Sequence, residues 1–506
     1  MLARLRELPF FVLLLVLSGL AMLLPAIYAL SLDAFAIARS FFYACILILL
    51  ISALIGLSLN TYKATSIARN HLLTLVSAYL LLPLVFAVPF HEGHGQTTYF
   101  DAWFEMLSDF TTTGSTLYDN PWRVHPSLHL WRAIVGWFGG LFTLVTVLAI
   151  LAPMNLGGFE VRAALENRNQ AQSFVQIVRV AGTSERLTRF TWQIFPVYSA
   201  LTGALWIGLM AAGDSPFVAL CHAMSTLSTS GISPIGGVYW AESGFAGEIL
   251  IFLFMGFAIT RWAFAGGNML QERGRIYQDP EVRMALVLLI VVPAFLYLRH
   301  FFSSIEESRI EGIGAGLTSL WGSIFTTMSF LTTTGFESKA FPTVMDWSEL
   351  SSPGLVLVGL ALTGGGIATT AGGVKLLRIY ALFRHSEREL ERLVHPSSVG
   401  GSGQEARRIR RQGAQISWVF FMLFALSIIG TMVALSLTGV QFENAMVLAV
   451  ASLSNTGPLV ELAAETPISI SGITDGAKFV LAIAMVLGRL EALAIIALFN
   501  PDLWRK

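Results

Sequence analysis

Thr111-Thr112-Thr113-Gly114 is a polar stretch that follows an apolar segment, and close variants of it occur three more times in the chain. The other copies are Ser228-Thr229-Ser230-Gly231, Thr332-Thr333-Thr334-Gly335 and Ser454-Asn455-Thr456-Gly457. Every copy has hydroxyl or amide side chains before the glycine, an apolar residue four places before it and a small residue six places before it. A single stretch of this kind is commonly a turn, but four copies in the same context indicate a duplicated unit.

The final glycines of the four copies are 117, 104 and 122 residues apart. Glycine permits backbone angles that turn successive carbonyl groups the same way. Four such strands around one axis would form rings of carbonyl oxygens, which can replace the water shell of a cation. The repeats therefore predict an ion filter whose ligands are mainly backbone carbonyls of Thr112, Thr113, Gly114, Thr229, Ser230, Gly231, Thr333, Thr334, Gly335, Asn455, Thr456 and Gly457.

The composition indicates a membrane protein. Of the 506 residues, 55% are hydrophobic and 13% are charged, whereas a soluble domain carries about 25% charged residues. Long Phe- and Leu-rich runs predict membrane helices rather than the strands of an outer-membrane barrel. The net charge of zero indicates no nucleic-acid partner, and Cys45 and Cys221 have neither metal-ligand spacing nor a disulfide pattern. The sequence contains no P-loop, GxSxG or HExxH motif.

Two apolar runs, at 8–30 and 38–59, precede the first filter stretch. A signal peptide is the alternative interpretation of the first run, but the run has about twenty residues and a second one follows at once. We therefore expect residues 1–69 to form an extra pair of membrane helices.

Four units follow, each with an apolar span, a short apolar segment, a filter stretch and a returning span. The short segments cannot cross a bilayer, so they are predicted to be re-entrant pore helices at 99–110, 215–227, 316–331 and 443–453. The predicted spans are 71–90 and 130–155, 190–212 and 246–269, 283–302 and 353–383, and 414–438 and 477–498. The units cover 70–189, 190–282, 283–412 and 413–506, and with the first pair they give ten spans.

The charges orient these spans. With both termini inside, the inner segments hold 23 of the 32 basic residues, which follows the positive-inside rule and places the filter stretches on the outer side. The outer segments also hold acidic residues, which would raise the cation concentration at the mouth unless they are ordinary solvated charges. These acids are Asp109, Asp119, Asp214, Glu306, Glu307, Glu337 and Glu443.

Two features inside the predicted spans are unusual. Residues 363–373, Thr-Gly-Gly-Gly-Ile-Ala-Thr-Thr-Ala-Gly-Gly, interrupt the long run 353–383; they fit unwound backbone lining a cavity or a close helix contact. Arg489 lies in the middle of the predicted span 477–498. Burying a charge at that depth costs free energy, so such a residue normally faces a polar interior or a charged partner. Glu491 is close in sequence but points elsewhere on a helix, and Arg261 is a weaker candidate nearer an inner end.

Together, the four filter stretches, the interrupted helix and the buried arginine resemble the Trk/Ktr/HKT superfamily of potassium transporters. The resemblance covers nearly the whole chain and is closest to the bacterial TrkH-type membrane subunits. It implies an all-α membrane protein with four pseudo-repeats of helix, pore helix, filter loop and helix around one central pore. It also implies a gate below the filter, formed by Gly364, Gly365, Gly366, Thr369, Gly372, Gly373 and Arg489.

The resemblance further implies potassium uptake across the bacterial inner membrane by a homodimer with one pore per chain. A cytosolic TrkA-type nucleotide-binding subunit would regulate it, docking on the basic inner segments 157–189 and 375–411. The chain has no GxGxxG fingerprint of its own, so we expect K⁺ as the transported ion and no organic cofactor. A glycine in all four stretches resembles the potassium-selective members. Asn455, where the other copies have threonine, departs from the repeat and predicts different packing behind the filter.

Two other functions were considered. A secondary transporter coupling potassium to sodium or protons would need an additional ion site, and the sequence does not distinguish it from channel-like flux. A membrane enzyme such as a lipid-modifying transferase would need an acid–base or nucleophile constellation near the interface. The sequence shows none, so we expect a transporter and not an enzyme.

Overall fold

The computed structural model describes residues 10–58, 67–152, 158, 183–260, 279–303, 313–348, 354–395, 411–464 and 466–490. Every regular element within these ranges is a helix, which confirms the predicted all-α architecture. Outside the described residues lie Arg261, Glu306, Glu307, Glu491 and most of the basic stretch 157–189. The α-helices are α2 (Phe10–Ala21), α3 (Leu23–Ser31), α4 (Phe35–Ser58), α5 (Ile67–His94), α6 (Tyr99–Phe110), α7 (Pro126–Thr146), α10 (Thr183–Ala211), α11 (Pro216–Ser228), α12 (Gly244–Met255), α13 (Pro280–Ser303), α14 (Ile313–Leu331), α15 (Phe341–Ser348), α16 (Gly354–Thr363), α17 (Leu376–Val394), α19 (Arg411–Leu437), α20 (Phe442–Leu453), α21 (Leu459–Leu462) and α22 (Asp475–Leu490).

Within the described ranges, seven helices are long and apolar enough to cross a membrane. They are Phe11–Ser31, Phe35–Ser58, Leu75–His94, Pro126–Leu151, Arg186–Ala211, Pro280–Leu298 and Ala414–Leu437. Each matches a predicted span. Of the other three predicted spans, 246–269 and 477–498 continue past the described residues, and 353–383 is interrupted between α16 and α17. The total of ten spans stays a prediction.

The outer surface of these helices is apolar. On α4, Leu50 and Leu57 are exposed, Leu57 to 76%, and on α13 Ile290 is exposed to 67%. So much exposed apolar surface is unfavourable in water and suits lipid tails. Helices are compatible with that environment because their backbone polar groups are satisfied internally.

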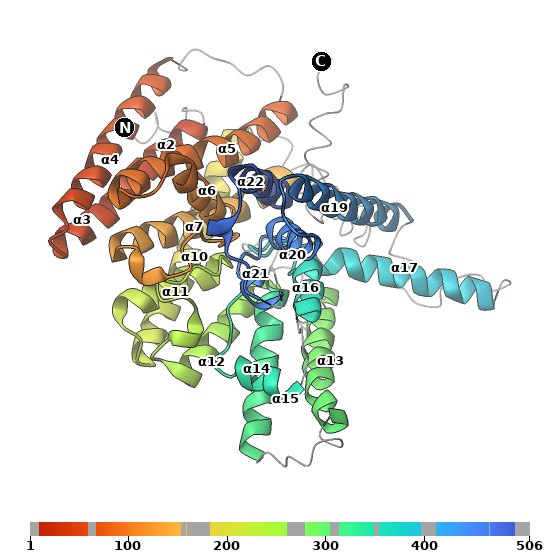
Figure 1. Ribbon diagram of the computed structural model, residues 1–506. Coiled ribbons are helices and arrows are strands. Elements are labelled where there is room, and N and C mark those ends of the chain that lie inside the picture. The colour runs from red at the N-terminus through yellow and green to blue at the C-terminus, as the bar shows by residue number, and fades with distance from the viewer. Residues whose placement is uncertain are drawn as a thin grey trace.

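The helices follow one another around a common centre (Figure 1). The four short helices α6, α11, α14 and α20 each pack against the helices of their own unit, for example α6 against α5 and α7. Neighbouring units meet through α7 and α11, α12 and α14, and α16 and α20, and α22 packs back against α5 and α6. The circuit is therefore closed, as four repeats around one axis require.

The short helices lie within three residues of the predicted pore helices at either end, and sequence signals explain where α6 and α11 start. Thr98 caps α6 by accepting the Asp101 N–H at 3.1 Å, and α11 begins with Pro216, whose fixed φ suits the first turn. All four helices end directly at a filter stretch. The negative end of each helix dipole thus points toward the filter, where it favours a cation.

Candidate functional site

The four filter stretches, called filter loops 1 to 4 (residues 111–114, 228–231, 332–335 and 454–457), share one backbone hydrogen-bond scheme. In each, the N–H of the residue before the glycine donates to the carbonyl of the small residue six places before that glycine. The pairs are Thr113 to Ser108 (2.8 Å), Ser230 to Ser225 (3.0 Å), Thr334 to Ser329 (2.9 Å) and Thr456 to Ala451 (2.8 Å). The small residue marks the point where the chain turns back on its pore helix.

The hydroxyls at the first and third positions of each loop are paired with each other. The oxygens of Thr111 and Thr113 are 2.8 Å apart, and the pairs in loops 2, 3 and 4 are 3.0, 3.0 and 3.2 Å apart. The first hydroxyl also donates to a carbonyl of the preceding helix, as Thr111 does to Leu107 at 2.8 Å. These side chains are engaged, so the backbone carbonyls are the expected ion ligands.

The middle residue of every loop adopts a left-handed backbone conformation, which the sequence did not reveal. The φ angles are 53° at Thr112, 53° at Thr229, 56° at Thr333 and 54° at Asn455. Such angles cost a non-glycine residue about 1–3 kcal/mol and occur mostly at functional sites. Asparagine tolerates this region best among non-glycine residues. Asn455 therefore fits its position, and its amide nitrogen donates to Met485 O at 3.0 Å on α22.

Three of the four filter glycines have positive φ: Gly114 at 72°, Gly231 at 67° and Gly335 at 81°. Gly457 differs from the other three, because its φ is not positive. Glycine is required there by close approach, because an added Cβ would overlap the backbone of Gly114 and Ser115.

The loops are neighbours in the order 1, 2, 3, 4 and back to 1. A Cβ on Gly114 would overlap the Ser230 carbonyl, and one on Gly231 would overlap the Thr334 carbonyl. Loop 4 contacts loop 1 directly, because the Gly457 N–H donates to the Thr113 carbonyl at 2.6 Å. Four stretches separated by more than a hundred residues of sequence thus meet at one place.

Loop 4 lies further into the ring than its partners. The Pro458 ring is so close to Gly231 and Gly335 that a Cβ on either would come within 2.8 to 2.9 Å of it. The Asn455 amide also donates to the Thr113 hydroxyl at 3.0 Å. In this conformation the Thr113 carbonyl of loop 1 is already occupied, because it accepts from the backbone N–H of Gly457 in loop 4.

The chain is unwound between α16 and α17, as the glycine-rich segment (residues 363–373) predicted. Gly364, Ala368 and Gly373 have positive φ and the whole segment is buried except for Thr363. Its amides are satisfied by other parts of the protein: Gly366 N–H donates to Ala258 O at 3.0 Å, and Ile367 N–H to the Glu281 carboxylate at 2.8 Å.

The glycine-rich segment touches three of the filter loops. The Gly372 N–H donates to the Thr333 hydroxyl of loop 3 at 2.8 Å, and a Cβ on Gly372 would overlap the Ser454 carbonyl of loop 4. The Thr370 hydroxyl donates to Leu227 O at 3.2 Å, directly before loop 2. A movement of this segment would therefore reach the filter.

Comparisons with known proteins agree with this geometry. A sequence profile described as TrkH, cation transport protein, matches residues 323–506. The Trk system potassium uptake protein TrkH of Salmonella typhimurium is 31% identical over 444 residues, which cover 87% of this chain and 86% of that protein. The chain belongs to the TrkH family. The Trk system potassium uptake protein TrkG of Escherichia coli is 27% identical over 97% of the chain and 96% of that protein.

The crystal structure of the potassium transporter TrkH from Vibrio parahaemolyticus has the same fold, with a TM-score of 0.79 and 26% identity. The match covers 99% of this chain and 100% of that one. As a TrkH-family chain, the protein is a multi-pass membrane transporter and not an enzyme, as predicted.

Arg489 of this TrkH-family chain is buried at 7% exposure on α22. Its Nε donates to the Thr143 hydroxyl of α7 at 3.0 Å, and that hydroxyl lies 2.9 Å from the Tyr79 hydroxyl of α5. Among the described residues no carboxylate pairs with it, and the neighbours that it contacts there are hydroxyl groups. The preceding residue, Gly488, packs against Leu453 O just before loop 4.

Two predicted outer acids of this TrkH-family chain do not face the mouth. Asp109 is fully buried and lies 3.5 Å from Arg132, and Asp214 is buried and accepts from the Ser243 N–H at 2.8 Å. Asp109 lies within α6 rather than in an outer loop, whereas Asp214 lies in the loop before α11 but is buried by its contact with Ser243. Asp119 and Glu443 are exposed, and Glu337 is partly buried. Burial, together with the Glu461 carboxylate, raises the pKa of Glu337 to about 7.

Proposed function

We propose that this chain takes up K⁺ across the bacterial inner membrane through the four filter loops. The observation that carries the proposal is the hydrogen-bond scheme that all four loops share, in a ring closed by contacts between successive loops. Relatives along most of the chain are named potassium uptake proteins, which supports K⁺ as the transported ion. The proposed ligands are the carbonyls of residues 112–114, 229–231, 333–335 and 455–457.

The glycine-rich segment and Arg489 are the proposed gate. The segment abuts loops 3 and 4, and its glycines leave no side chain in the way when it moves. Arg489 carries a positive charge that no carboxylate of the described residues pairs with, and this charge would raise the electrostatic barrier for a cation nearby. A homodimer, cytoplasmic termini and a cytosolic TrkA-type subunit on segments 157–189 and 375–411 complete the proposal. No organic cofactor is needed for this function.

Ion flux into liposomes containing the purified chain tests the function. Potassium and rubidium should enter faster than sodium and lithium, because a fixed carbonyl cage fits the larger dehydrated ions. Flux should follow an imposed voltage without a sodium or proton gradient. Flux that requires such a gradient would favour coupled transport, and equal flux of all four ions would contradict the filter.

Arg489→Ala should raise K⁺ flux several-fold in the same liposomes, since the electrostatic cost near the ion path falls. Arg39→Ala is the matched control, because Arg39 is exposed on α4 in the extra helix pair. Unchanged flux in a folded Arg489→Ala protein would mean that this arginine serves only to bind α7.

A further inference from the structure

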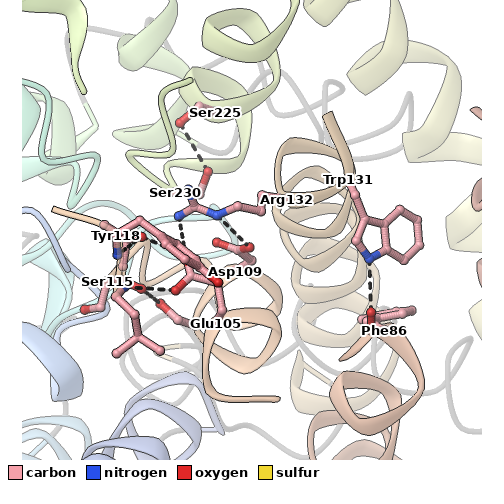
Figure 2. Close-up of polar contacts among 12 residues, drawn as sticks. Phe86, Glu105, Asp109, Ser115, Tyr118, Trp131, Arg132, Ser225 and Ser230 are labelled. Atoms are coloured by element: carbon pink, nitrogen blue, oxygen red, sulfur yellow. Dashed lines mark hydrogen bonds and ion pairs between the residues drawn. The ribbon is translucent and has the colours of Figure 1, made fainter. Parts of the chain in front are cut away.

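A buried charge cluster holds the exit of filter loop 1 (Figure 2). The Glu105 carboxylate of α6 accepts from the Thr116 hydroxyl at 2.8 Å and from the Leu117 N–H at 3.0 Å. Arg132 of α7 pairs with Glu105 at 2.5 Å and with Asp109 at 3.5 Å. All three charged side chains are at most 3% exposed. Arg132 therefore links the two sides of loop 1. Asp109 precedes the loop, and Glu105 accepts hydrogen bonds from Thr116 and Leu117 after it.

Loop 2 has a related clamp at the equivalent positions. His222 lies nine residues before Gly231, as Glu105 lies nine before Gly114. Its Nε2 is 2.9 Å from the hydroxyl of Ser233, which is two residues after the glycine, as Thr116 is in loop 1. His222 is fully buried. In loop 2, the neutral hydrogen bond between His222 and Ser233 takes the place of the charged hydrogen bond between Glu105 and Thr116 in loop 1.

Loop 3 is clamped by a carboxylate from the neighbouring unit. Glu248 of α12 accepts from the Lys339 N–H at 2.7 Å and from the Ser338 hydroxyl at 3.0 Å, both after Gly335. The Trp321 indole of α14 donates to the same carboxylate at 2.7 Å. Glu248 is 3% exposed, so this is a third buried polar grip on a loop exit.

Loop 4 lacks such a clamp. The positions that hold Glu105 and Thr116 in loop 1 are Leu448 and Leu459 in loop 4, both buried and apolar. Within the described residues, no side chain hydrogen-bonds to residues 458–464. Loop 4 is also the one loop whose glycine lacks a positive φ. The N–H of this glycine, Gly457, donates to the Thr113 carbonyl of loop 1.

We propose that Glu105, His222 and Glu248 are the positioning residues of the filter, each fixing one loop exit, and that unclamped loop 4 is its movable member. Loops 1 to 3 form a rigid three-sided frame, and loop 4 moves between an inward position, with Pro458 near Gly231 and Gly335, and an outward one that completes the carbonyl ring around K⁺. Buried charge-assisted hydrogen bonds are strong and costly to break, which suits a fixed frame, whereas apolar contacts are non-directional and permit sliding. This inference rests on the proposed filter function.

Hydrogen exchange on the wild-type protein tests the movable loop without any substitution. In potassium-free sodium buffer, peptides covering residues 455–464 should exchange about tenfold faster than those covering 112–118, 229–235 and 333–339, because among the described residues no side-chain hydrogen bond ties residues 458–464, directly after the loop-4 glycine, to the surrounding protein. Potassium should slow exchange in loop 4 more than in the other three. Equal exchange in all four loops in both buffers would overturn the proposal.

Three variants test the clamps, each in liposome flux with K⁺ and Na⁺. Glu105→Gln and Glu248→Gln keep the shape but lose the second acceptor oxygen, and His222→Leu gives loop 2 the residue that loop 4 has. Each should lower K⁺ over Na⁺ selectivity about threefold to tenfold while K⁺ still enters, because a loosened loop widens the cage. Asp101→Asn is the matched control, since Asp101 lies on α6 but pairs with Lys478 away from the loop exits.

The outcomes separate this inference from the proposed function. If wild type and Asp101→Asn discriminate K⁺ and all three clamp variants match them, the filter stands and the clamps are overturned as positioning residues. A merely structural role would lower thermal stability without changing the selectivity ratio, and that result also counts against the proposal. If a variant does not fold, the remaining variants and the exchange measurement decide.

Discussion

Gly114→Ala is expected to reduce K⁺ over Na⁺ selectivity by roughly tenfold to a hundredfold, since about 1.4 kcal/mol of differential binding is a factor of ten. Gly114 has a φ of 72°, where a side chain costs about 1–2 kcal/mol. In addition, its Cβ would overlap the Ser230 carbonyl, which belongs to the neighbouring loop. The substitution would therefore displace a proposed ion ligand as well as strain its own loop. We expect Gly231→Ala to act in the same way, through the Thr334 carbonyl, and Gly335→Ala to act through its φ of 81° and overlap with the Pro458 ring.

Selectivity in liposomes measures this effect, and Gly430→Ala is the control. Gly430 lies in α19 with no atom within 4 Å of an added Cβ, so alanine there should leave selectivity unchanged. Gly457→Ala should also impair the filter, but by overlap with Ser115 rather than by backbone angle. Wild-type selectivity in all four filter variants would remove these loops from the ion path.

The repeated parts of the protein were the predictable ones. The pore helices were located within three residues at each end because each is a short apolar segment that ends at a filter stretch. The interruption at residues 363–373 was indicated by the run of glycines together with the family resemblance. Such features depend on residues that are close in sequence. The comparison of four copies of one pattern also makes the assignment of each copy more reliable.

Features made by contacts between helices could not be predicted. Asp109 looked like a mouth acid because nothing near it in sequence shows that Arg132 of α7 lies 3.5 Å away. The left-handed middle residues were hidden because threonine normally avoids that region, and only the closed ring maintains it. The clamp from Glu248 to loop 3 joins residues 90 and 91 positions apart, which no periodicity reveals.

The position of the glycine-rich segment is set by its neighbours rather than by its own packing. Its backbone is held by Ala258 of the second unit, Glu281 at the start of α13 and Thr333 of loop 3. The segment leads directly into α17, which extends away from the body of the protein (Figure 1). A soluble partner that grips α17 would therefore pull on the residues beside the filter. Such a partner shifts the gate only through contacts that differ between the closed and open states.

Deleting Gly364 to Gly366 should consequently raise basal K⁺ flux and weaken the response to the proposed nucleotide-binding subunit. The deletion shortens the segment and removes the Gly366 hydrogen bond to Ala258, so the remaining chain cannot reach its present position between loops 3 and 4. Paired flux assays with and without the subunit measure both effects. Gly359→Ala, one turn earlier in α16 with no atom within 4 Å of an added Cβ, is the control and should behave as wild type. A folded deletion variant that conducts no better than wild type, yet still responds fully to the subunit, would exclude this segment from gating and leave Arg489 as the remaining candidate.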